Sequence, residues 1–430
     1  MKSFINLFSF LVVTLFVTSL SAQIQYTRVN NQDGMHEFEP SKMDATEYKG
    51  FKLDIGGAFT QGFQAISHSN ADSFRLASKK LYALGNGFNL AAANLNFDVQ
   101  LGDGIRMFLE NYMASRHHNE FWVKGGYIQI DKLPMFGNPE WFTKYVRVKL
   151  GHMEINYGDQ HFRRSDGGNT IFNPFVENHI MDQFATEIGG EVYIFPVDGL
   201  MLMAGMTNGL IRNDVFDYST NPSTAVQKKN PAILLKAAYD KKASDKLRYR
   251  LSASLYSNSQ TPRSTLYSGD RTGSNYYGAM ELTSFNATSN FTSGRFSPGT
   301  FNSITAFIIN PFVKFQGLEI FGSYEVANGK AITETTDRKT SQLAIEGVYR
   351  FLANEQMFLG ARYNTVTSRL SGLTSDVDLN RFTLAAGWFP TKNLLLKGEY
   401  VTQKYENFPG NDYRNQGAFD GITIQAVVGF

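Results

Sequence analysis

Residues 342–351 read QLAIEGVYRF, and residues 357–364, after a short break, read MFLGARYN. Apolar and polar side chains alternate in both stretches, so that Leu343 and Ile345 share one face and Glu346 lies on the other. A period of two residues is typical of a β-strand with one apolar and one polar face. The two stretches and the break between them therefore predict a pair of antiparallel strands joined by a tight turn.

The same alternation continues along most of the chain, for example over residues 51–64 and 246–255, and no comparable helical period appears. We expect about 16 such strands, with 18 as the alternative, each of roughly nine to twelve residues. Strands of that length cross a bilayer when they are tilted. The chain is thus predicted to be all-β.

The breaks between the predicted strands alternate between short and long. Tight turns with Gly, Pro, Asp or Asn are predicted at residues 102–104, 196–199, 316–317, 353–356 and 390–393, and long polar connections at 67–87, 156–185, 209–230, 258–300, 327–340 and 404–415. Nothing in a soluble β-sandwich or solenoid favours short connections at one end of the strands and long connections at the other. A transmembrane antiparallel up-and-down β-barrel does, because its turns on one side of the membrane are short and its loops on the other are long.

The first residues predict the compartment. Residues 1–22 carry one early positive charge, an apolar stretch and small residues before Gln23, which is the order of a secretory signal peptide; an uncleaved anchor is the alternative. We assign residues 23–49 to a short periplasmic extension and 50–430 to the barrel. The expected location is the outer membrane, with its lipid and the barrel-assembly machinery as partners.

Composition removes several other classes of protein. The 430 residues contain no cysteine, which excludes disulfides, thiolate metal sites and cysteine nucleophiles. The net charge of +2 gives no electrostatic argument for nucleic acid. No His-Glu-x-x-His spacing or dinucleotide fingerprint is present, and His117-His118 lie in a short polar loop. We expect no enzyme, no cofactor and no metal site.

The chain ends with GITIQAVVGF over residues 421–430, another alternating strand that places the terminal Phe430 on the apolar face. This ending resembles the C-terminal assembly signal of outer-membrane barrels.

A barrel of this size encloses a water-filled channel unless a loop fills it. We expect the connection 156–185 to fold inward and narrow the channel, as the third external loop of general porins does. It carries His161, Arg163 and Arg164 beside Asp159 and Asp166. Fixed charges at a constriction select ions by sign. Arg163 and Arg164 could instead pair with the two acids to hold the loop against the wall.

One segment resembles a known family. Arg147, Lys149, the run 151–154, Tyr157-Gly158, the run 163–166 and Asn173-Pro174 are similar to porin-like outer-membrane proteins of Bacteroidetes, which are grouped with the phosphate-selective porins of the O/P type. The resemblance implies a channel of 16 strands, often trimeric, for small anions. It also implies a basic path, for which the candidates are Arg147, Lys149, Arg163, Arg164, Arg248, Arg250, Arg362 and Arg381.

This sequence departs from that pattern because acids also fall on the polar faces of its strands: Asp54, Glu187, Glu191, Glu319, Glu325 and Glu346. Anion or phosphate preference therefore stays open. The expected function is a porin for passive diffusion of small hydrophilic solutes and ions. The alternative is a non-conducting barrel that acts as an adhesin or scaffold through the Ser-, Thr-, Gly- and Asn-rich connection 258–300, read as an exposed binding surface.

Overall fold

The computed structural model describes residues 24–43, 46–71, 79–114, 116, 120–209, 215, 229–299 and 301–430. The predicted signal peptide and the pair His117-His118 lie outside these described residues.

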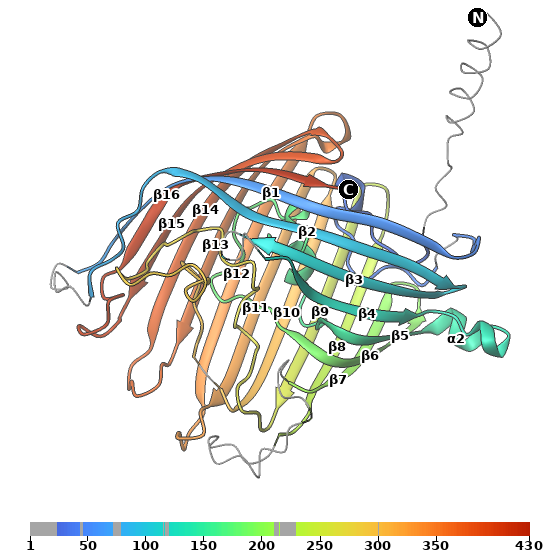
Figure 1. Cartoon of the computed structure of the whole chain (residues 1–430), viewed down its shortest axis with the longest axis horizontal. Helices are drawn as coiled ribbons and strands as arrows, with labels where there is room; N and C mark the ends of the chain where they lie inside the picture. The colour runs from blue at the N-terminus through green and yellow to red at the C-terminus, as the bar shows by residue number, and fades with distance from the viewer. Residues whose placement is uncertain are drawn as a thin grey trace, which may run out of the picture.

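The described residues form one closed antiparallel barrel in which each strand pairs with its neighbours in sequence and β1 pairs with β16 (Figure 1). The prediction of a barrel of about 16 strands is therefore confirmed. The strands are β1 (Lys52–Ser69), β2 (Gly87–Gly102), β3 (Ile105–Ala114), β4 (Trp122–Ile130), β5 (Val146–Glu154), β6 (Thr186–Val197), β7 (Leu200–Thr207), β8 (Ala232–Lys242), β9 (Leu247–Asn258), β10 (Ser303–Phe315), β11 (Leu318–Lys330), β12 (Arg338–Phe351), β13 (Met357–Ser368), β14 (Val377–Thr391), β15 (Leu394–Glu406) and β16 (Ala418–Gly429).

The connections differ between the two ends of the barrel, as the sequence predicts. At what we call the short-turn end, β2 and β3 are joined through Gly104 and β6 and β7 through Gly199, both with positive φ angles that favour glycine. The β4–β5 connection is longer and carries the short helix α2 (Glu140–Tyr145). The other end, called the loop end, carries the long connections. Among the described residues, no helix is long and apolar enough to cross a membrane.

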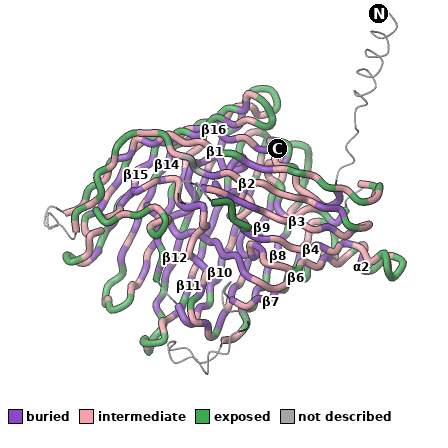
Figure 2. Tube along the Cα trace, viewed as in Figure 1, coloured by how far each residue is buried: buried purple, intermediate pink, exposed green. Residues whose placement is uncertain are grey.

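Register places apolar side chains outside the barrel and polar ones inside. Glu346 on β12 lies directly opposite Arg362 on β13, so both point to the same side, and both are buried inside the barrel. Their neighbours Ile345 and Tyr363 are 51% and 46% exposed on the outer face. Figure 2 shows this alternation of buried and exposed residues along the strands. A soluble protein would place its apolar face inward; this barrel reverses the arrangement.

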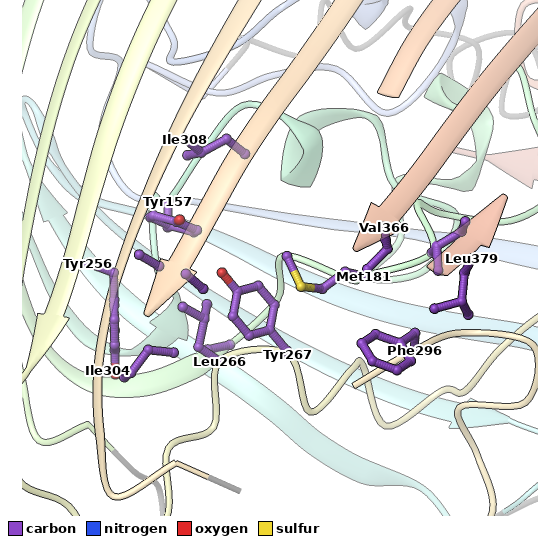
Figure 3. Packing of buried hydrophobic residues seen from close by; sticks show 14 of the residues in the cluster. Tyr157, Met181, Tyr256, Leu266, Tyr267, Phe296, Ile304, Ile308, Val366 and Leu379 are labelled. Atoms are coloured by element: carbon purple, nitrogen blue, oxygen red, sulfur yellow. The ribbon is translucent and has the colours of Figure 1, made fainter. Parts of the chain in front are cut away.

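Three segments fill much of the interior. We call them the N-terminal segment (residues 24–43), the constriction loop (155–185) and the long loop (259–299). The constriction loop is buried almost throughout, which confirms the inward fold expected for it. In Figure 3 its Tyr157 and Met181 pack against strand residues, with side chains of the long loop beside them; the labelled members of this cluster are Tyr157, Met181, Tyr256, Leu266, Tyr267, Phe296, Ile304, Ile308, Val366 and Leu379.

The long loop corrects one expectation. Its polar composition predicts an exposed surface, yet most of residues 261–280 and of 293–298 are buried. Leu266, Tyr267, Tyr276 and Phe296 draw it inward, because they join the same apolar cluster as the constriction loop. Exposed residues of the long loop concentrate between 283 and 290. Much of the segment that was to carry an adhesin surface therefore packs inside the barrel, and its exposed part is short.

Candidate functional site

The constriction loop continues from β5 and is held by hydrogen bonds from its backbone to side chains of the barrel wall. Gly158 N donates to Ser254 Oγ at 3.1 Å, and Ile180 N donates to Asn364 Oδ1 at 2.6 Å. Gly158 has a φ of 69°, and a Cβ at this position would lie 3.1 Å from Ile308 Cδ1. The loop lies so close to the wall that its backbone groups are satisfied by the inward polar residues of the strands.

The first of three ionic clusters, which we call the Arg250 cluster, joins the constriction loop to β8, β9 and the N-terminal segment. Asp159 accepts hydrogen bonds from Arg250 Nε at 2.7 Å and pairs with Lys236 Nζ at 2.8 Å. Glu39 pairs with the same two cations, at 2.7 Å and 2.9 Å. Burial would raise the pKa of Glu39, but the charges of Arg250 and Lys236 outweigh it and lower that pKa to about 2.

The second, the Arg164 cluster, joins the constriction loop to the long loop. Arg164 pairs with Asp166 and, through Nη1, with Asp182 at 2.9 Å. Arg295 of the long loop also pairs with Asp182, at 2.8 Å, and with Glu177, at 2.6 Å. Burial opposes ionisation of Asp182, but the guanidinium groups of Arg164 and Arg295 lower its pKa. These buried charges compensate one another, so they fasten the two loops together.

The third, the Glu346 cluster, binds the constriction loop to β12 and β13. Glu346 accepts from Arg362 Nε at 2.9 Å, from Arg163 Nη2 at 3.3 Å and contacts His179 Nε2 at 3.1 Å. Arg362 Nη1 also donates to the carbonyl oxygen of Glu177, at 2.7 Å. The cluster thus contains one residue from each of the two strands and two residues, Arg163 and His179, from the constriction loop. These contacts fix the position of the loop across the interior.

Two further basic candidates, Arg381 and Arg147, are bonded as well. Arg381 donates to the carbonyl oxygens of Asn178 and Gly294, at 2.8 and 2.7 Å. Arg147 donates to Asp131 at 2.8 Å and to the carbonyl oxygen of Pro40 at 2.7 Å.

Two more candidates, Arg248 and His161, have fewer contacts. Arg248, partly exposed, forms two hydrogen bonds with Asp240, at 2.8 and 2.7 Å. His161 Nε2 lies 2.8 Å from Asn156 Oδ1. The structure thus brings most of the sequence-predicted residues inside the barrel, but as members of packed networks.

Open space lies on the opposite side of the interior. A cavity of about 550 Å³ lies between the inner faces of β1–β5, the N-terminal segment and the constriction loop. Its charged lining residues are Arg28, Asp54, Asp98, Arg106, Glu110, Lys124, Lys149 and Glu154. A second hollow, of about 460 Å³, is not part of this interior space: it lies on the apolar outer face of β6–β10, beside exposed residues such as Val192 and Leu235.

The acids of this cavity have cationic neighbours. Lys52 pairs with Asp54 at 2.9 Å, Arg106 with Asp98 at 2.7 Å, and Lys124 lies 3.9 Å from Glu110. Lys124 also pairs with Asp270 of the long loop. The paired acids leave little net negative charge on this wall.

Lys149 differs from these residues. Its ammonium lies 4.3 Å from the ring centroid of Tyr127, and among the described residues this ammonium has neither a hydrogen bond nor an ion pair.

The sequence analysis named Lys149 as a candidate but missed four other charged residues of the cavity: Arg106, Lys124, Asp98 and Glu110. Three of them could have been found from the sequence. The alternation of polar and apolar residues on the two strands that flank the turn at residues 102–104 places Asp98, Arg106 and Glu110 on the inner face.

No group of three His, Asp or Glu side chains in the described part of the chain is arranged to hold a metal ion.

Neither a family model nor a curated protein sequence matches the chain. Its fold is similar to that of several solved outer-membrane proteins. The trimer form of in-vitro folded OmpT of Vibrio cholerae has 11% sequence identity and a TM-score of 0.52, over 89% of this chain and 100% of that chain. The anion-selective porin from Comamonas acidovorans has 10% identity and a TM-score of 0.50, over 88% and 100%. The outer membrane channel DcaP of Acinetobacter baumannii has 10% identity and a TM-score of 0.52, over 89% and 99%. The chain therefore has the barrel fold of outer-membrane porins.

Proposed function

We propose that this protein is an outer-membrane porin that lets small hydrophilic solutes and ions diffuse passively. The observation that carries the proposal is the cavity of about 550 Å³ along β1–β5, whose charged lining lies inside a barrel with an apolar outer face. Water and ions occupy polar interior space of this kind. The fold likeness to an anion-selective porin and to an outer-membrane channel supports the same function.

We further propose a weak anion preference set by Lys149 and Arg28. Both face the cavity, and neither forms an ion pair with a carboxylate among the described residues. The acids of the same wall are offset by neighbouring cations. These two cations, rather than an excess of charge in the lining as a whole, favour anions in the passage.

Selectivity for phosphate is not part of this proposal. A phosphate path needs guanidinium donors that are free to bind the anion. Arg163, Arg164, Arg250 and Arg362 instead pair with carboxylates, and Arg381 donates to two carbonyl oxygens and to Gln403. The O/P-type resemblance and the Bacteroidetes origin stay predictions.

Placement in the membrane follows from the same proposal. We place the short-turn end and residues 23–49 on the periplasmic side, with residues 1–22 as the signal peptide and Phe430 as part of the signal read by the barrel-assembly machinery. A homotrimer is the proposed assembly, supported by the trimer form of the Vibrio cholerae protein.

Single-channel recording in a planar bilayer tests the function. The refolded mature chain should give stepwise openings and a reversal potential directed toward anions under a KCl gradient, with no extra block by added phosphate. Lys149→Gln should weaken the anion preference. Lys404→Gln, at an exposed position on β15, is the matched control and should not. A correctly folded barrel without openings would contradict the proposal.

A further inference from the structure

The N-terminal segment crosses the short-turn mouth of the barrel and contacts turns around its circumference. Near β2 and β3, Gln25 Oε1 accepts from Gly104 N at 2.9 Å. On another side of the mouth, Gln32 N donates to the carbonyl oxygen of Lys392, between β14 and β15, at 2.8 Å. Lys42 pairs with Asp131, next to β4, at 3.0 Å. The segment is therefore fixed across the opening and does not lie beside it.

Two adjacent residues of this segment insert toward the constriction loop. The Phe38 ring is 3% exposed and packs against Phe162 of the constriction loop and Phe312 of β10, with ring centroids 5.7 and 5.5 Å away. The guanidinium of Arg250 lies 4.3 Å from the centroid of the Phe38 ring. The Phe38 ring is thus enclosed by two aromatic rings and a guanidinium group. It stabilises the docked N-terminal segment through hydrophobic burial and a cation–π contact.

Glu39 supplies a negative charge that balances the cations of the Arg250 cluster. Without it, Asp159 is the carboxylate that pairs closely with both buried cations, Lys236 and Arg250. Arg250 also reaches Asp240, but at 3.5 Å, and Asp240 is already bonded to Arg248. Glu39 accepts from Arg250 Nη2 at 2.7 Å and from Asn156 Nδ2 at 3.0 Å, and pairs with Lys236. The strands and the constriction loop together thus form a basic pocket with an aromatic lining, complementary to an acidic peptide.

We propose that residues 24–43 are an intrachain plug, and that Phe38-Glu39 is the ligand of this peptide-binding pocket. When the pair leaves the pocket, the short-turn mouth opens and the conducting space widens. The inference rests on the proposed porin function, because it concerns how that channel is closed. It assigns the pocket a partner of defined chemistry: an acidic peptide with a preceding aromatic residue, supplied by the chain itself.

The full mature chain carrying Phe38→Ala and Glu39→Gln tests the plug in single-channel recordings. We expect mean conductance or open frequency to rise at least about twofold, because the segment loses both its aromatic and its ionic anchor. The matched control is Asp33→Asn in the same segment, whose exposed carboxylate pairs with Lys392 and with no other cation of the described residues. This control should record like the wild type.

A synthetic peptide of residues 32–43 provides the second arm. Added to the short-turn side of the double variant, it should restore the lower conductance in a saturable manner. The same peptide with Glu39→Gln should require at least about a tenfold higher concentration, since it loses two charge-assisted contacts. The Asp33→Asn peptide should bind like the original.

The outcomes separate the two proposals. If wild type and double variant conduct identically and the peptide has no effect, the plug is overturned and the porin function stands. If neither conducts although both fold as heat-modifiable barrels, the porin function fails and the plug fails with it. Should the double variant not fold, the isosteric Glu39→Gln variant carries the test, with a smaller expected rise.

Discussion

Charged residues on the inner faces of β12 and β13 and several of those on β1–β5 differ in how far they are covered. On β12 and β13, Glu346 and Arg362 are each 1% exposed and are bonded to the constriction loop. On β1–β5, Asp54, Asp98 and Lys149 are only half-buried and face the cavity. The difference teaches that an arginine or acid on the inner face of a barrel is not by itself a pore residue. Its role depends on whether an inward loop covers it.

Removing a charge from the packed wall should have the largest effect. Arg362→Met leaves Glu346 with fewer partners and the carbonyl oxygen of Glu177 without this donor, so we expect a loss of about 3–5 kcal/mol in unfolding free energy. Denaturant unfolding in detergent micelles measures it. Lys149→Met on the open wall is the matched control and should stay within about 0.5 kcal/mol. Equal losses for both variants would remove the distinction between the walls.

Reversing a charge on the open wall should change selectivity. Lys149→Glu places a negative charge in the cavity, so the anion-to-cation permeability ratio should fall at least about twofold. Reversal potentials under a KCl gradient measure it, with Lys404→Glu, at an exposed position on β15, as the control. An unchanged ratio would mean that ions do not pass along β1–β5.

Acidification should loosen the contact between the N-terminal segment and the packed wall. The pKa of Glu39 is about 2 when docked and near 4.5 when free, so its contribution is complete above pH 4.5 and is lost as the pH falls toward 2. The same cations, working against burial, also lower the pKa of Asp159, which stays charged over most of this range.

Conductance should therefore be constant from pH 7 to 5 and rise below about pH 4. The Glu39→Gln variant should show a smaller change over the same pH range. A wild-type response that begins near neutral pH would point to a different titrating group.

Arg248 should give the smallest effect, because it is on β9 of the packed wall but is not covered by a loop. Its pair with Asp240 is partly exposed, so Arg248→Ala should cost no more than about 1 kcal/mol. The unfolding free energies of Arg248→Ala and Arg362→Met, both measured by denaturant unfolding in detergent micelles, allow the two losses to be compared directly. A loss as large as that of Arg362→Met would show that burial by the loop is not the deciding factor.

The inward position of the long loop illustrates where sequence reasoning fails. Its many Ser, Thr, Gly and Asn residues predict exposure, and the predicted adhesin surface followed from that composition. Tyr267 and Tyr276 nevertheless donate from their hydroxyl groups to Glu325 and Glu399 of the wall. Those acids are on β11 and β15, so the reason for burial is invisible without the barrel around the loop.

The sequence alone predicted about 16 strands, their inner and outer faces and the alternation of short and long connections, because each depends on residues close together in the chain. The inward loop was predicted from the third external loop of general porins. Only the tertiary structure decided which charges pair and which face open space. Glu39 and Arg250 are 211 residues apart, and Arg295 and Asp166 are 129 apart. Local periodicity carries no information on such partners, since closure of the barrel and the inward folding of three separate segments bring them together.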